Sequence, residues 1–328
     1  MSPAPPRRPL AVARRGLLRD PAPLPPAPLA AEASVRRLSL QVARRLDGLL
    51  QGDHLGYLPG PGTEPAEARA YAPGDDVRRI DWAVTARTGD PHVRQAVAER
   101  ELETTLVVDL TPSMSFGTVR SEKREVAVAL AAAVGHLAGG PGDRLGAVVL
   151  SDRVRHVPAR PGRLAALALL HVLQTTRPAD GAGPSLADGL RLVANPPRRR
   201  GLVVVVSDLL ETGTGEPSWA GPLRALARRH DVVVAEVVDP RELELPSVGV
   251  LRLVDPETGR HLEVQTASPR LRERYAEAAA ARRAAHATAV RRAGAGHVVL
   301  RTDRDWLVAL AGHLAARRRT RGTTRRPS

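Results

Sequence analysis

Oxygen-bearing side chains follow a short apolar run near residue 109. The apolar and β-branched residues 104–108 lead into Asp109, and Pro112 then breaks the run, a pattern typical of a buried strand that ends in a loop. Asp109, Thr111 and Ser113 alternate along this stretch, and alternate residues of an extended chain face the same way. A carboxylate and two hydroxyls are hard oxygen ligands that suit Mg²⁺ or Mn²⁺. The alternative is a polar loop whose hydroxyls cap the following helix.

The D-x-T-x-S motif of these residues resembles the first motif, D-x-S-x-S, of the metal-ion-dependent adhesion site in von Willebrand factor A-type domains. The threonine keeps the hydroxyl of the serine it replaces. The resemblance implies that Ser185, which follows a glycine-rich loop, and Asp208, which ends the apolar run 202–206, complete a site for Mg²⁺ or Mn²⁺. Taken by itself, Ser185 is suited to cap a helix over residues 186–194.

Apolar strands alternate with helical segments over most of the chain, which predicts an α/β fold with a doubly wound, mostly parallel sheet and helices on both faces. Sites in such sheets form beyond the carboxyl ends of the strands, where Asp109 and Asp208 are expected. Residues 154–159 are expected as an antiparallel edge strand, and residues 251–265 as a β-hairpin. The other expected strands span residues 104–109, 145–151, 202–206, 231–238 and 296–302, and the expected helices span residues 31–50, 121–139, 164–174, 186–194, 222–229, 269–292 and 305–316.

A charged segment over residues 64–101 contains two large aromatic side chains, although aromatic residues make up only 2% of the chain. Tryptophan, tyrosine and arginine are the residues that most often anchor protein interfaces, so this segment is a candidate partner-binding surface. The alternative is an internal salt-bridge network that fixes the segment onto the following domain. The candidate partner-binding residues are Arg69, Tyr71, Asp75, Asp76, Arg78, Asp81, Trp82 and Arg87.

The string R-x-Y-x-P-G-D-D-x-R-x-I-D-W, which begins at Arg69, is followed by A-R and then by D-x-T-x-S-M. Together these motifs resemble the domain-of-unknown-function 58 family over residues 52–300. The resemblance implies an A-type fold and a MoxR-type AAA+ ATPase as partner. It therefore implies a non-enzymatic adaptor, or co-chaperone-like protein, that links the ATPase to a client protein. The family's upstream Glu-Phe pair is absent, because Pro65 follows Glu64.

Composition limits the other classes of function. The net charge of +14 is concentrated in arginines near the two ends, and the chain has no cysteine, which excludes disulfides and thiolate metal sites. We find no apolar run approaching the ~20 residues that a membrane-spanning helix needs, and we expect a cytoplasmic protein. The arginine-rich ends leave peripheral contact with an anionic membrane or nucleic acid as an alternative, but no specific nucleic-acid motif is present.

A metal-dependent hydrolase is the other alternative. Phosphatases that begin chemistry at an aspartate use D-x-D, and Thr111 stands where the second aspartate acts as general acid. We therefore expect no enzyme. The expected organisation is a disordered leader over residues 1–30, a helix and signature segment over residues 31–101, an A-like domain over residues 102–316, and a basic disordered tail over residues 317–328.

Overall fold

The computed structural model of the chain describes most of the residues after the proline-rich leader. The described residues are 29–50, 68–94 without 74, and 102–323 without 141, 180, 182, 195–199, 212–214 and 255–258. The expected leader lies almost wholly outside these residues, as does the end of the expected basic tail.

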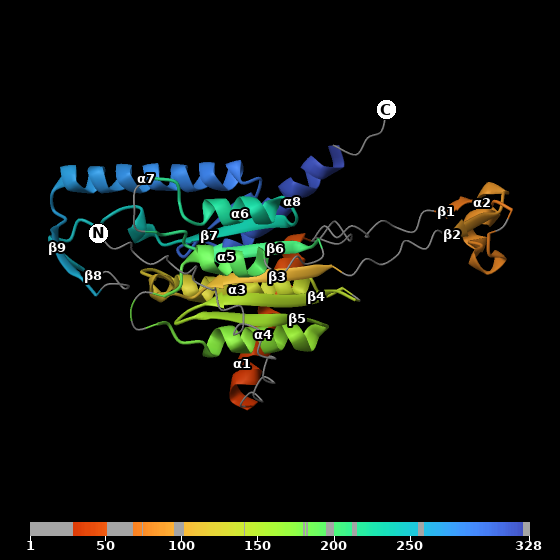
Figure 1. The fold of residues 1–328 in the computed structure, drawn as a ribbon, viewed down its shortest axis with the longest axis horizontal. Helices are drawn as coiled ribbons and strands as arrows, with labels where there is room; N and C mark the ends of the chain where they lie inside the picture. The colour runs from red at the N-terminus through yellow and green to blue at the C-terminus, as the bar shows by residue number, and fades with distance from the viewer. Residues whose placement is uncertain are drawn as a thin grey trace, which may run out of the picture.

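A six-stranded sheet forms the centre of the molecule (Figure 1). Its strands are mostly parallel, as the alternation of strands and helices predicts, and β5 is the antiparallel edge strand. The strand order β10-β7-β6-β3-β4-β5 comprises β10 (Gly296–Arg301), β7 (Asp231–Val238), β6 (Leu202–Ser207), β3 (Glu103–Asp109), β4 (Arg144–Leu150) and β5 (Val154–Pro161).

The connections of the sheet reverse direction between β3 and β6. From β3 the chain runs outward through β4 to β5, and it then crosses back to β6 and continues through β7 to β10. In a doubly wound sheet, such a reversal opens a crevice beyond the carboxyl ends of the two central strands, and ligands bind there. Residues 104–108 of β3 pair in parallel register with residues 202–206 of β6, so Asp109 and Asp208 end up at this crevice.

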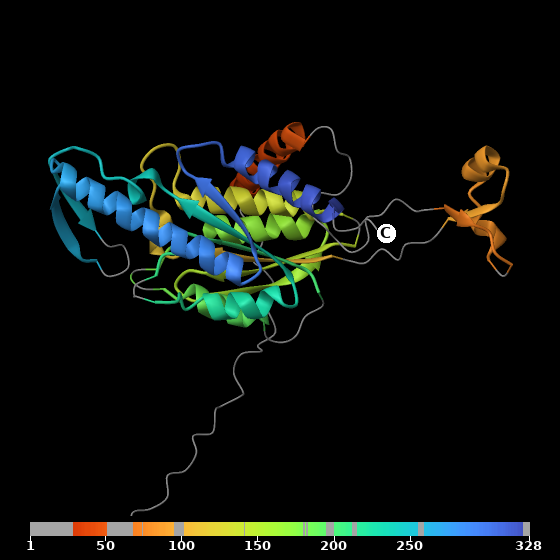
Figure 2. The ribbon, with the colours of Figure 1, turned by 90° about the horizontal axis from the view of Figure 1, so that it is seen from above.

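Helices cover both faces of the sheet (Figure 2). Leu106 and Val108 of β3 face one apolar cluster and Val107 faces the other, as the alternation of a strand requires. The first cluster contains residues of α1 (Leu29–Leu50), α3 (Lys123–Leu137), α4 (Arg163–Thr175) and α8 (Trp306–Thr323), and the second contains residues of α5 (Leu186–Ala194), α6 (Ala220–Ala227) and α7 (Pro269–Arg292).

Two expected boundaries are wrong. The first helix does not form a unit with the signature segment, because Val35, Val42 and Leu46 of α1 are buried in the core of the main domain. The last helix does not end at residue 316, since α8 continues to Thr323. Arginine is a strong helix former, so the basic sequence extends the helix instead of ending it.

Two 3₁₀ turns and a β-hairpin lie in the connections of the main domain. A 3₁₀ turn, η2 (Pro112–Ser115), follows β3, and another, η3 (Pro240–Glu242), follows β7. After η3 comes the predicted hairpin of β8 (Val250–Val254) and β9 (His261–Gln265). Among the described residues, no helix combines the length and apolar character needed to cross a bilayer.

A buried glutamate of β7 contacts both α7 and the neighbouring strand β10. The Oε2 atom of Glu236 lies 2.9 Å from His297 Nε2, and its Oε1 atom lies 3.4 Å from His286 Nδ1. Arg283 lies 3.8 Å away. Although burial opposes the charge, the hydrogen bonds from the two histidines lower the pKa of Glu236 to about 2. The ionised carboxylate therefore stabilises the folded state.

Replacing Glu236 with glutamine should remove a pH-dependent part of this stability. The contribution of a carboxylate with a lowered pKa is present above its ordinary pKa of 4.5 and is lost as the pH falls towards about 2. We expect Glu236→Gln to lower the free energy of unfolding by about 1–3 kcal/mol at pH 6, with the difference shrinking between pH 4.5 and 2. Urea unfolding at pH 6, 4 and 3 measures this.

Glu263→Gln is the matched control. Its carboxylate pairs with Arg252 at 3.0 Å on the exposed hairpin, and exposed pairs contribute less than about 1 kcal/mol. A loss of stability in Glu236→Gln that is equal at all three pH values would contradict the assignment.

Candidate functional site

Asp109 is the last residue of β3 and lies at the sheet reversal with 6% of its surface exposed. Its Oδ1 atom accepts hydrogen bonds from the backbone N–H of Thr111 at 3.0 Å and from Thr111 Oγ1 at 2.6 Å. Its Oδ2 atom accepts a hydrogen bond from Ser207 Oγ at 2.8 Å. Both carboxylate oxygens are thus held in place by the two central strands and the loop after β3.

The hydroxyls of Thr111 and Ser113 converge on the same point. Both residues are buried, and their oxygen atoms lie 3.3 Å apart. Thr111 precedes η2 but makes no side-chain cap hydrogen bond to it, and the cap of α3 is a reciprocal pair formed by Glu122 and Glu125. The alternative in which these hydroxyls cap the following helix is therefore not what the structure shows.

Asp208 follows β6 and is 4% exposed. Its Oδ1 atom accepts a hydrogen bond from the backbone N–H of Leu210 at 3.1 Å. The intervening Leu209 has a φ of 58°, which is uncommon for a residue other than glycine. Burial and then the charge of Asp208 raise the pKa of Asp109 to about 6. Asp208 directly follows Ser207, whose hydroxyl binds Asp109.

Ser185 lies on a loop that approaches the site, but its side chain bonds elsewhere. A Cβ atom added to Gly183 would lie 2.5 Å from the carbonyl oxygen of Ser151 and 3.0 Å from Thr111 Cγ2, so the glycine-rich loop packs against Thr111. The hydroxyl of Ser185 donates to Asp188 Oδ2 at 2.7 Å and accepts from the Asp188 backbone N–H at 3.3 Å. Ser185 thus makes the helix-capping contacts of the alternative interpretation.

Lys123 is a residue of this edge that the motifs did not reveal. It opens α3, is completely buried, and donates to Asp208 Oδ2 at 2.8 Å and to Glu242 Oε1 at 2.5 Å. Burial disfavours the ammonium, but the charges of the two carboxylates outweigh it and raise the pKa of Lys123. The signal that could have identified it is compositional, because Lys123 is the only lysine among 49 lysine and arginine residues.

A buried aspartate continues the polar network towards β10. Asp239 accepts hydrogen bonds from the backbone N–H and Oγ1 of Thr118 at 2.9 and 2.7 Å, and from Thr302 Oγ1 at 2.7 Å. Its own N–H donates to Glu242 Oε2 at 3.0 Å. The loops after β3, β6 and β7 and the end of β10 are therefore tied together.

The oxygen atoms at Asp109 fit a small divalent cation. Octahedral Mg²⁺ binds oxygen at about 2.0–2.1 Å, which places adjacent ligand atoms roughly 3 Å apart. The distances of 2.6 Å from Asp109 to Thr111 and 3.3 Å from Thr111 to Ser113 lie on either side of that value. Among the described residues, no group of three or more His, Asp or Glu side chains could hold a metal ion, so a site here depends on the hydroxyls.

The aspartates of the signature segment hold its local structure. This segment contains β1 (Ala68–Ala70), η1 (Val77–Arg79), α2 (Trp82–Thr88) and β2 (His92–Arg94), and β1 pairs with β2. Asp75 accepts a hydrogen bond from the backbone N–H of Ala72, Asp76 caps η1 and Asp81 caps α2. These carboxylates therefore stabilise turns and helix starts, which is a common use of aspartate.

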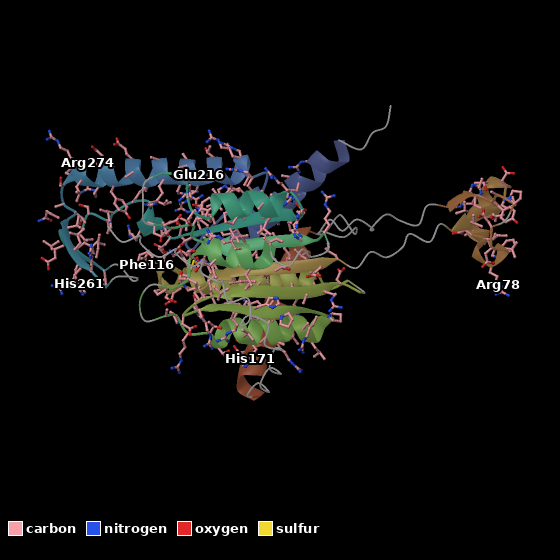
Figure 3. All side chains as sticks on the ribbon, in the orientation of Figure 1. Arg78, Phe116, His171, Glu216, His261 and Arg274 are labelled. Carbon is pink, nitrogen blue, oxygen red and sulfur yellow. The ribbon has the colours of Figure 1, made fainter. Side chains whose placement is uncertain are left out.

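Other predicted partner-binding residues of this segment are exposed. Trp82 is 71% exposed, and Arg78 projects from the segment (Figure 3). Tyr71 is half-buried, and the guanidinium of the exposed Arg87 donates to the Ala83 carbonyl at 3.3 Å. Arg69 lies on β1, and its side chain is outside the described residues.

Solved structures with a similar arrangement share little sequence with this chain. BatB from Bacteroides thetaiotaomicron superposes with a TM-score of 0.41 and 16% identity, covering 66% of this chain and 99% of BatB. A von Willebrand factor type A protein from Catenulispora acidiphila superposes with a TM-score of 0.38 and 10% identity, covering 69% of this chain and 42% of that protein.

Relatives by sequence are much more similar. An uncharacterized protein of Mycobacterium tuberculosis is 50% identical over 289 residues, which cover 88% of this chain and 90% of the relative. An uncharacterized protein of Mycobacterium avium is 43% identical over 164 residues, which cover 50% of this chain and 94% of the relative. The family described as Protein of unknown function DUF58 matches residues 67–285. This chain therefore belongs to the DUF58 family.

Proposed function

We propose that this protein is a non-enzymatic interaction module that binds a partner through a divalent cation at the carboxyl edge of its sheet. One observation carries the proposal: the two central strands end at the sheet reversal in the buried carboxylates of Asp109 and Asp208, beside the converging hydroxyls of Thr111 and Ser113. Doubly wound sheets bind ligands at this position.

Each residue has a distinct part in this proposal. Asp109, Thr111 and Ser113 would hold Mg²⁺ or Mn²⁺, Asp208 adds negative charge nearby, and Ser185 lies on the loop that packs against Thr111. The cation, when bound, supplies a positive centre that attracts an acidic group of a partner. The protein's own part is to keep the oxygen atoms fixed in a buried setting, where electrostatic attraction is stronger than in water.

The site is better suited to binding than to hydrolysis. Hydroxyl oxygens fill the positions around Asp109 where a hydrolase that uses D-x-D places a second carboxylate, and a hydroxyl is too weak an acid to replace it as general acid. Both oxygens of Asp109 already accept hydrogen bonds, so the carboxylate is arranged as a fixed acceptor.

A MoxR-type AAA+ ATPase is the partner we propose, with this protein as the adaptor that presents a client to it. The resemblance of the signature motifs to DUF58 proteins supports this partner. The signature segment supports a second contact, because Trp82 is exposed at the first position of α2 while Asp81 fixes the start of that helix. An exposed aromatic side chain on a fixed element loses little conformational entropy when it binds.

Asp109→Asn tests the cation site. The amide keeps the shape of the side chain and an oxygen for Thr111, but it removes the charge. We expect Mn²⁺ affinity, measured by electron paramagnetic resonance of free Mn²⁺, to fall at least about tenfold, which corresponds to about 1.4 kcal/mol. Binding to the MoxR-type ATPase of the same genome, measured by pull-down in Mg²⁺, should fall with it.

The stability of Asp109→Asn provides the control. A buried acid whose pKa is raised destabilises the fold once it ionises, here as the pH rises from 3.8 to above about 6. In metal-free buffer at pH 8, the variant should therefore unfold at the same temperature as the parent or higher. Unchanged Mn²⁺ affinity in a folded variant would refute the cation site.

Trp82→Ala tests the second contact. Because the side chain is 71% exposed, we expect little change in the unfolding temperature and at least about a tenfold loss of affinity for the ATPase, as for an interface anchor. Leu164→Ala, at a residue of α4 that is 77% exposed, is the matched control and should bind normally. Equal binding by both variants would remove the signature segment from the interface.

A further inference from the structure

The single lysine of the chain joins three loops at the candidate site. Lys123 donates its backbone N–H to the carbonyl of Phe116 at 2.9 Å in the loop after β3. Its ammonium donates to Asp208 in the loop after β6 and to Glu242 in η3 after β7. The same ammonium lies 5.8 Å from the centre of the Phe116 ring, within the range of a cation–π contact.

A lysine suits this position better than an arginine does. Its ammonium is a compact point charge with three donors, whereas the planar guanidinium of arginine is shaped for a paired, two-pronged contact with one carboxylate. The two acceptors of Lys123 belong to different loops. Every other strongly basic residue of the chain is an arginine, so the lysine at this buried position is an exception in the composition.

The ammonium of Lys123 neutralises part of the negative charge that would otherwise attract a divalent cation. Asp208 Oδ2 is bound to the ammonium, and Asp208 Oδ1 accepts the N–H of Leu210. A cation held by Asp109, Thr111 and Ser113 would therefore meet a second carboxylate that is already partly neutralised. It would also be repelled by the ammonium, and such repulsion between like charges is strong at buried positions.

We propose that Lys123 is a resident cation that competes with the divalent cation for Asp208 and keeps the affinity of the site for that cation low. This inference rests on the proposed function, because it assumes the site at Asp109. The low affinity has a consequence for partner binding. An acidic group of the partner that binds the cation raises the affinity of the site for the cation. By linkage, the cation raises the affinity of the protein for the partner by the same factor. The binding of a weakly held cation therefore depends on whether the partner is bound.

The test is Mn²⁺ binding to the full chain, measured by electron paramagnetic resonance in four variants. Lys123→Met/Glu242→Gln removes one positive and one negative charge, which leaves the net charge unchanged and frees Asp208. We expect it to bind Mn²⁺ at least about tenfold more tightly, or about 1.4 kcal/mol. Glu242→Gln alone keeps Lys123 and leaves Asp208 as the remaining carboxylate partner of the lysine at this edge. The affinity of this variant for Mn²⁺ should therefore equal that of the parent or be lower.

Two further variants serve as controls. Arg252→Gln/Glu263→Gln removes an exposed ion pair of the hairpin, also without changing net charge, and should bind Mn²⁺ as the parent does. Asp208→Asn should weaken binding, because it removes the carboxylate for which the two cations compete. Circular dichroism and thermal unfolding establish which variants are folded.

The outcomes separate this inference from the proposed function. If the parent binds Mn²⁺ and the folded double variant binds it no more tightly, the resident-cation role is refuted while the cation site stands. Tighter binding by Glu242→Gln would refute it as well, even if the double variant did not fold. If neither the parent nor any variant bound Mn²⁺, both the cation site and this inference would fall.

Discussion

The parallel pairing of β3 with β6 is the constraint on which the candidate site depends. Both strands are buried along almost their whole length and have apolar residues at their centres, and such strands are stable only within a sheet that is covered on both faces. The pairing register and the reversal of the connections bring Asp109 and Asp208 to one crevice from positions that are far apart in the sequence. The rest of the fold supplies the two helix layers that keep these strands buried.

Burial of charge is the second property of this edge. Asp109, Asp208, Asp239 and Lys123 are all buried, and charges are expensive to bury unless they are paired and hydrogen-bonded. Lys123 forms ion pairs with Asp208 and Glu242, while Asp109 and Asp239 accept hydrogen bonds from hydroxyl groups. These contacts join the loops after three strands to each other and to the end of β10. These contacts hold the loops of the edge in one arrangement, so the proposed cation site would not require the loops to reorder.

Much of the fold could be predicted from periodicity and turn residues, but contacts across the chain could not. The partners of Lys123 lie 85 and 119 residues away, so spacing along the chain gives no indication of them. The sequence predicts Ser185 on a glycine-rich loop near the site, but the nearby Asp188 provides a local hydrogen-bond partner that occupies its hydroxyl. The apolar face of α1 predicts a helix without indicating which core buries it. In the signature segment, Asp76 and Asp81 cap helix starts, although the charged cluster also indicates a partner-binding surface.

The central claim is that Asp109, Thr111 and Ser113 hold a divalent cation. It is tested most directly by crystals of the protein grown or soaked with Mn²⁺, with an anomalous difference map calculated from data collected near the manganese absorption edge. The account predicts one strong peak about 2 Å from the hydroxyl oxygens of Thr111 and Ser113, at the carboxyl ends of β3 and β6. A well-ordered carboxyl edge with no peak there at saturating Mn²⁺, or with a peak only at surface carboxylates, would contradict it.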